Sequence, residues 1–84
     1  MLKEIIELLE RTIILIGVLI NRDMPMKEEQ RNGLKEAYQF HVDLYDIVRQ
    51  TGTIMPHQLM ELDRMQENYG RIIKELCRDR GLIP

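Results

Sequence analysis

The sequence predicts an all-α fold, a three-helix up-down-up bundle, and three observations lead to this prediction. The chain of 84 residues is rich in Leu, Ile, Met, Glu and Arg, which are residue types that favour helices. Three segments carry apolar residues with the 3.6-residue period of an amphipathic helix. Two short breaks containing proline or glycine separate them, and short connections favour antiparallel neighbours. We therefore expect a single helical domain over residues 1–84, a size at which oligomerisation often completes the core.

The first segment, residues 2–20, is more apolar than one helix of a bundle requires. One stripe is suited to face a core and consists of Leu2, Ile5, Ile6, Leu9, Ile13, Ile16 and Ile20. The apolar side chains outside this stripe are Leu8, Ile14, Leu15, Val18 and Leu19. A monomer rarely leaves so much apolar surface bare. These five residues are therefore the predicted partner-binding residues.

The second segment is predicted to form a helix over residues 25–50. Pro25 suits the first turn of a helix, and Glu28 and Glu29 suit its positive end. Its apolar stripe consists of Leu34, Ala37, Tyr38, His41, Leu44, Tyr45 and Val48. Gly52 can adopt the left-handed conformation that ends a helix, and Ile54 can then pack back on the last turn.

The third segment is predicted to begin at Pro56 and to end at about Arg80. Its apolar stripe consists of Leu59, Leu62, Met65, Tyr69, Ile72, Ile73, Leu76 and Cys77. Its opposite face is charged, and Met60 is expected to be exposed there. Gly81 is a plausible C-terminal cap.

Composition and charge exclude several partners. The net charge is −2, so the chain lacks the overall positive field that generic nucleic-acid binding requires. The apolar run between Arg11 and Asn21 is shorter than the roughly 20 residues of a membrane span. The acidic residues that precede it do not resemble a signal peptide. Cys77 is the single cysteine, which favours a reducing compartment. We therefore expect neither nucleic acid nor membrane as a partner, and a location in the cytoplasm.

No constellation of residues predicts catalysis, a cofactor or a metal site. His41 lies inside an apolar stripe without a second ligand three or four residues away, so we interpret it as a core or interface histidine. Cys77 lies on an apolar face, where cysteine packs as a small hydrophobic residue. Asp63 falls at the edge of its stripe, and a small bundle offers little cleft for paired acids. We therefore expect no enzymatic activity.

The span Arg49 to Ile73, "RQTGTIMPHQLMELDRMQENYGRII", resembles small helical proteins encoded by phages and prophages of Gram-positive bacteria. Those proteins commonly have a Gly-Tyr-Ile-Thr turn, a helix rich in Glu and Leu, and then an aromatic residue. This chain departs from them because it lacks the Gly-Gly-Asn step after the aromatic residue, where Gly70 stands alone. The resemblance implies a phage accessory or structural role in the bacterial host cell and no active site.

Two alternative functions rest on other residues. Residues 59–63, "LMELD", are similar to the Ser-Gln-Glu-Leu-Asp signature of small sporulation phosphatases that act on aspartyl-phosphate response regulators. The last three positions match, and the resemblance implies Asp63 as the residue of interest. The second alternative is a nucleic-acid-binding accessory protein, whose basic residues would be Arg71, Lys74, Arg78 and Arg80.

Together, these observations predict a small non-catalytic protein that binds other proteins through helix-mediated association. The expected partners are a second copy of the chain, as a homodimer or larger homo-oligomer, a host protein or a virion protein. Burial of the extra apolar side chains of residues 2–20 would drive the association.

Overall fold

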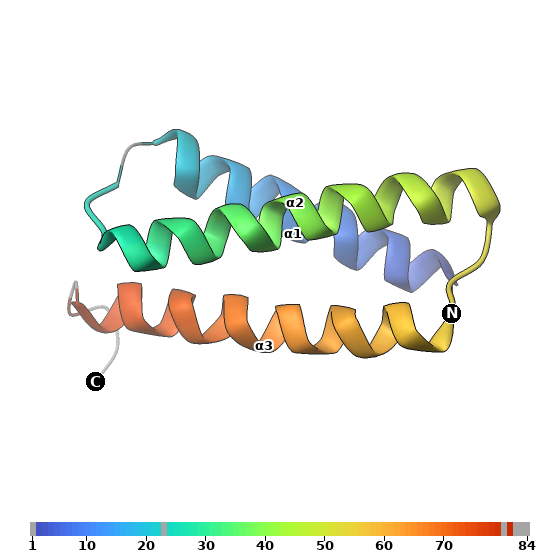
Figure 1. Ribbon diagram of the computed structural model, residues 1–84. Helices are drawn as coiled ribbons and strands as arrows, with labels where there is room; N and C mark the ends of the chain where they lie inside the picture. Colours follow the sequence, from blue (N-terminus) through green and yellow to red (C-terminus); the bar gives the residue numbers. More distant parts are fainter. Residues whose placement is uncertain (1, 23, 80, 82–84) are drawn as a thin grey trace.

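The protein folds into three α-helices that run up, down and up, as the sequence predicts (Figure 1). The computed structural model describes residues 2–22, 24–79 and 81, and every regular element in them is helical. The helices are α1 (Leu2–Asn21), α2 (Glu28–Thr51) and α3 (Pro56–Asp79). Close backbone contacts join α2 to α1 and α2 to α3, so α2 is the central element of the bundle.

The second helix begins three residues later than the sequence predicts, and the predicted start at Pro25 is wrong. Lys27 has extended backbone, and its N–H donates to Oε1 of Gln30 at 3.0 Å. A glutamine at the third helical position satisfies the N-cap amide in this way, so Lys27 caps the helix. Nη2 of Arg31 donates to the carbonyl oxygen of Met24 at 3.1 Å. That bond ties the preceding segment to the first turns of α2.

The third helix begins at Pro56, as predicted, and uses the same kind of cap. The N–H of Met55 donates to Oε1 of Gln58 at 2.7 Å. Gln58 is the third residue of α3, as Gln30 is of α2. A glutamine at this position therefore sets the start of both helices.

A left-handed glycine ends α2, which confirms the predicted turn. Gly52 has φ +71°, and its N–H donates to the carbonyl oxygen of Val48 at 2.8 Å. Oγ1 of Thr51 accepts from the N–H of Thr53 at 3.3 Å. Ile54 packs against the core cluster that contains Val48. The turn therefore directs α3 back along α2.

The core consists of two clusters, one in each half of the bundle. The cluster near the loop between α1 and α2 contains Ile16, Leu34, Ala37, Ile72 and Leu76. The cluster near the loop between α2 and α3 contains Leu9, Leu44, Val48 and Leu62. Each cluster includes residues from all three helices. The apolar stripes read from the sequence therefore supply the core.

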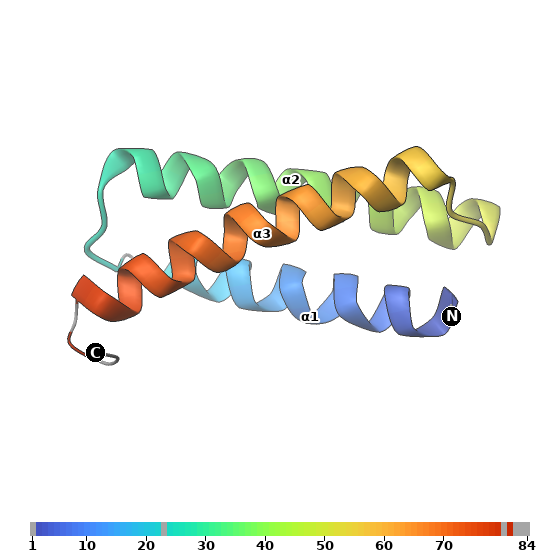
Figure 2. The same ribbon diagram turned by 90° about the horizontal axis from the view of Figure 1, so that it is seen from below.

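One side of the bundle is more open than the other two. Within the described helices, no Cα atom of α1 lies within 8 Å of a Cα atom of α3. The two helices diverge in Figure 2 toward the end of the molecule where α1 begins. Side chains bridge the gap, because Nε2 of Gln66 on α3 donates to Oγ1 of Thr12 on α1 at 3.1 Å. The first helix therefore leaves more of its circumference uncovered than α2 does.

Candidate partner-binding surface on the first helix

Three of the predicted partner-binding residues are exposed on α1: Ile14 and Val18 on the side that points away from the other helices, and Leu15 between that side and the side that faces α3. Ile14, Leu15 and Val18 are 65%, 54% and 42% exposed, and we call them the α1 outer patch. At 100° per residue Ile14 and Val18 lie opposite Leu9 and Ile16, which are fully buried, whereas Leu15 lies about 100–120° from these two residues. In Figure 2, α1 forms one edge of the molecule and neither α2 nor α3 lies beyond it. The patch is therefore open to a partner.

The other two predicted residues lie at the border between this surface and the core. Leu8 and Leu19 are half-buried, and each packs against one of the two core clusters. They share a side of α1 with Thr12, whose hydroxyl accepts the hydrogen bond from Gln66 of α3. That side consequently faces α3. Leu8 and Leu19 therefore contribute to folding and only flank the outer patch.

Charged residues lie on the same outer side of α1, before and after the patch. Glu4, Glu7 and Arg11 precede it and are exposed. Arg22 follows it, is exposed, and donates its N–H to the carbonyl oxygen of Val18 at 3.0 Å. This bond continues the helical hydrogen-bond pattern by one residue. The outer side of α1 thus has the acidic residues Glu4 and Glu7 at its start, Arg11 directly before the apolar patch, and Arg22 after it.

A shallow groove of about 470 Å³ runs beside the patch, between α1 and α2. Gly17 and Tyr38 line it together with Ile14 and Val18. A Cβ at Gly17 would lie 3.7 Å from Cε2 of Tyr38. The sequence indicates only that Gly17 costs helix stability. The structure shows that this position lets the aromatic ring lie close against the helix backbone and extends the apolar surface.

A buried polar network at the centre of the bundle accounts for His41. The side chain is fully buried, and Nδ1 lies 2.6 Å from the carbonyl oxygen of Ala37. Because a carbonyl can only accept, Nδ1 carries the proton and Nε2 is the acceptor. Nε2 of Gln66 lies 2.8 Å from Nε2 of His41 and also donates to Thr12. Both ring nitrogens are therefore used within the protein, which confirms the interpretation of His41 as a core histidine.

Burial lowers the pKa of His41 below its ordinary value of 6.5, and the hydrogen bond to Ala37 opposes this effect in part. The neutral ring that the network requires is consequently the favoured form. The sequence indicates a local hydrogen bond for His41, but it does not reveal Thr12 and Gln66 as partners. Thr12 and Gln66 are polar residues beside the apolar stripes of the first and third helices, and this pattern could have suggested them as partners of His41.

The residues named for other chemistries are not assembled into a site. Asp63 is exposed and Cys77 is half-buried, and the other histidine of the sequence, His57, is exposed. Among the described residues, no group of three or more His, Cys, Asp and Glu side chains is arranged to hold a metal ion. Of the basic residues, Arg71, Lys74 and Arg78 are exposed on α3, and Arg80 lies outside the described residues.

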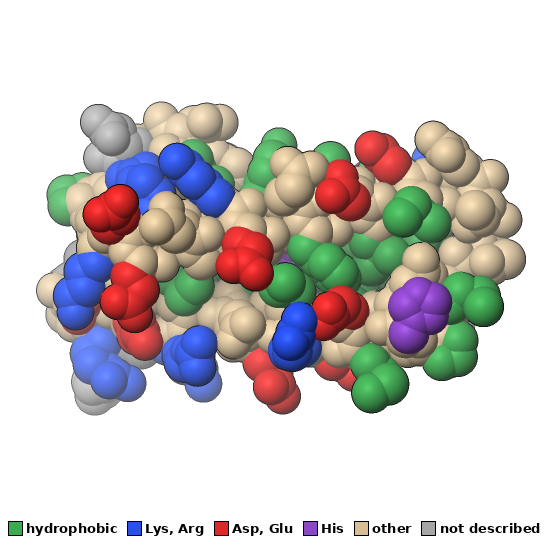
Figure 3. Space-filling model, in the orientation of Figure 1, with side chains coloured by type: hydrophobic (Ala, Val, Ile, Leu, Met, Phe, Trp, Pro, Cys, Tyr) green, Lys and Arg blue, Asp and Glu red, His purple; other side chains and the backbone are tan. Residues whose placement is uncertain are grey.

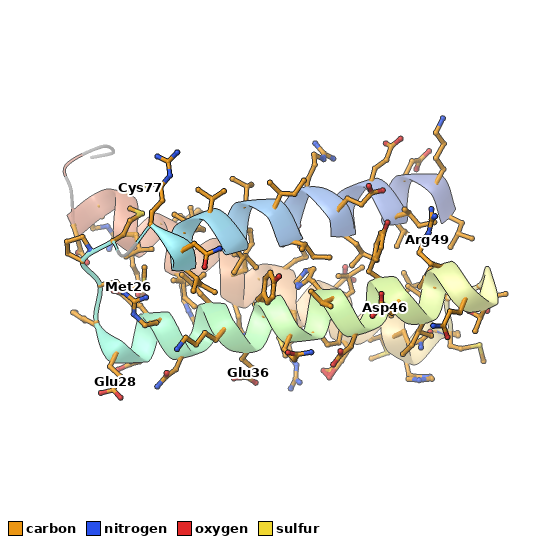
Figure 4. All side chains as sticks on the ribbon, turned by 90° about the horizontal axis from the view of Figure 1, so that it is seen from above. Met26, Glu28, Glu36, Asp46, Arg49 and Cys77 are labelled. Carbon is orange, nitrogen blue, oxygen red and sulfur yellow. The ribbon has the colours of Figure 1, made fainter. Side chains whose placement is uncertain are left out.

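A cavity of about 520 Å³ lies between α2 and α3. Its lining includes three carboxylates, Glu29, Glu36 and Glu75, together with Arg71. Nε2 of Gln30 donates to Oε2 of Glu75 at 3.3 Å. Acidic and basic side chains are mixed across this part of the face in Figure 3. Glu36 lies on the side of α2 away from α1 (Figure 4), so this cavity is separate from the outer patch.

No family model, curated protein or solved structure matches this chain. None of the described helices has both the length and the apolar content that a membrane crossing requires. The surfaces of the protein are therefore the basis for assigning its function.

Proposed function

We propose that this protein is a small non-catalytic binding domain that associates with protein through the outer patch of α1. The observation that carries the proposal is the exposure of Ile14, Leu15 and Val18 on two successive turns of one helix face. Both core clusters are formed without these three side chains. Folding of the monomer therefore does not account for their apolar character, whereas binding of a partner does.

The size of the hydrophobic term is sufficient for a modest association. Full burial of a Val, Leu or Ile side chain is worth about 1.5–3 kcal/mol. Because each side chain of the patch is about half exposed, complete coverage would contribute about 1 kcal/mol per residue. Flanking contacts from Gly17, Tyr38 and Leu19 would add to this, and the loss of freedom on association would subtract from it.

A second apolar area lies at the other end of the protein but is less suited to be a docking surface. Ile47, Met55 and Met60 are 44%, 52% and 73% exposed. They come from three different elements, namely α2, the loop and α3. In Figure 3, hydrophobic groups there surround the histidine and are interrupted by acidic groups. Scattered exposed apolar residues of this kind are usual on a protein surface.

The experiment that tests the proposal is site-specific photo-crosslinking in the native cell. A photoreactive phenylalanine analogue replaces Ile14 in one variant and Met60 in the matched control, since both positions are more than half exposed. We expect a discrete protein adduct at position 14 and no comparable adduct at position 60. An equal yield at the two positions, or no protein adduct at position 14, would contradict the proposal.

We also propose that the protein serves as a phage or prophage accessory protein in the bacterial cytoplasm. The resemblance of residues 49–73 to small helical phage proteins supports this role. The position of the gene in the genome tests this role. We expect a gene that lies among phage structural, packaging or accessory genes, and a gene that lies among chromosomal genes without any prophage nearby would contradict the role.

A further inference from the structure

The exposed side of α1 has an ordered charge distribution in addition to its apolar centre. Glu7 precedes the patch by two turns, and Arg22 follows it by one turn. At 1.5 Å per residue, both lie about 11 Å from the point midway between Ile14 and Leu15. The acidic and basic groups are thus equally far from this point, which lies in the first half of the patch. A surface with this property is complementary to itself when one copy is reversed.

We propose that the partner of the outer patch is a second copy of this chain, packed with its α1 antiparallel to the first. This inference rests on the proposed function, since it names the occupant of the same surface. A two-fold axis passes between Ile14 and Leu15, so Ile14 of each copy meets Leu15 of the partner. Glu7 of each copy then faces Arg22 of the partner, which gives two opposite-charge contacts per dimer.

The parallel arrangement of two α1 helices is disfavoured by the same charges. It would place Glu7 against Glu7 and Arg22 against Arg22, and like charges in contact repel. In the antiparallel arrangement, Arg11 faces Val18 of the partner. Its aliphatic stem covers that apolar side chain while the guanidinium stays in water. Opposite charges therefore select the orientation, and apolar burial supplies the driving force.

The architecture of the monomer leaves room for this packing. Neither α2 nor α3 lies beyond α1 on its outer side (Figure 2). The wide spacing between α1 and α3 also leaves Leu15 more than half exposed on the side that faces α3. A second α1 can therefore reach Leu15 as well as Ile14 and Val18.

Charge reversal with sedimentation velocity tests the proposal. The test compares the dimerisation of four proteins: the wild type, Glu7→Arg, Arg22→Glu and the double variant with both changes. Each single change converts two attractive contacts into two repulsive ones, so we expect about ten-fold weaker dimerisation. The double variant restores opposite charges, and we expect its dimer constant to return to within about three-fold of the wild type. Glu36→Arg changes the charge equally on α2 and is the matched control, with no expected effect.

Three results would overturn the antiparallel dimer. They are a wild type that stays monomeric, single variants that dimerise like the wild type, and a double variant weaker than either single variant. A foreign protein crosslinked at position 14, together with a monomeric wild type, would reject the second copy as partner but leave the proposed function intact. Far-ultraviolet circular dichroism of every variant shows whether a loss of dimer is instead a loss of fold.

Discussion

At the scale of single residues, one glutamine joins all three helices at the centre of the protein. The amide nitrogen of Gln66 lies within hydrogen-bond distance of both Thr12 and His41, and His41 in turn donates to the backbone of Ala37. No buried side-chain nitrogen or oxygen among the described residues is left without a hydrogen-bond partner. The network therefore fixes the relative positions of the helices without a desolvation penalty from unpaired groups.

This network makes stability depend on pH. The pKa of His41 is lowered in the folded state by burial, so between that pKa and 6.5 the unfolded chain binds more protons. The contribution of His41 to stability is complete above pH 6.5 and is lost as the pH falls through the window below it. We expect the free energy of unfolding to fall by up to about 1.4 kcal/mol per pH unit in this window. Urea denaturation between pH 7.5 and 5.5 measures it.

The measurement is best made in a His57→Gln background, because the sequence contains two histidines and His57 is exposed. A control that also carries His41→Gln should lose the dependence over the same range. If the two proteins showed the same change in stability with pH, His41 would not be the group responsible.

At the scale of the elements, the helical glycines Gly70 and Gly33 differ in their surroundings. Apart from its two chain neighbours and the adjacent backbone of its own helix, no described atom lies within 4 Å of a Cβ added to Gly70, which is half-exposed on α3. A Cβ added to Gly33 on α2 would lie 2.6 Å from Cδ1 of Ile72, which is buried. Gly33 therefore permits a close approach of α2 and α3, whereas Gly70 has no comparable packing role.

The same substitution should consequently have different effects at the two positions. Alanine is favoured over glycine in a helix interior by about 0.5–1 kcal/mol. We expect Gly70→Ala to stabilise the protein by this amount and to raise Tm by roughly 2–8 °C. We expect Gly33→Ala to give no gain or a loss, because Ile72 must move. Thermal unfolding of both variants makes the comparison, and a larger gain for Gly33→Ala would show that the close packing of α2 and α3 is wrong.

Helix identity and order could be predicted from the sequence because the apolar periodicity and the Gly52 and Pro56 signals agree. The start of α2 could not be predicted from the sequence. Pro25 is a strong signal for a helix start, but the side chain of Gln30 decides which backbone amide is capped. The apolar excess of α1 was also predictable. Which of its side chains stay exposed was not, because the spacing between α1 and α3 determines that Leu19 is half-buried whereas Leu15 is 54% exposed.

At the scale of the whole molecule, the central position of α2 explains why the outer patch exists. α2 contacts both neighbours closely, whereas α1 has close backbone contacts with α2 and none with α3 within the described helices. A chain of this size buries a modest share of its surface on folding. Two copies joined along α1 would bury the outer patch of each copy. Association is therefore expected to bury the apolar surface that folding of the monomer leaves exposed, and it is also the proposed function of the protein.

The most direct test is the mass in solution of the wild type and of Leu15→Glu, measured by sedimentation equilibrium. Leu15→Glu places a charge within the α1 outer patch, and Met60→Glu places one at a still more exposed apolar position on α3. Concentrations up to about 1 mM reveal even an association of about −4 kcal/mol. We predict a dimer for the wild type and Met60→Glu, and a folded monomer for Leu15→Glu. A wild type that remains monomeric throughout this range, or a Leu15→Glu dimer as stable as the wild type, would contradict the account.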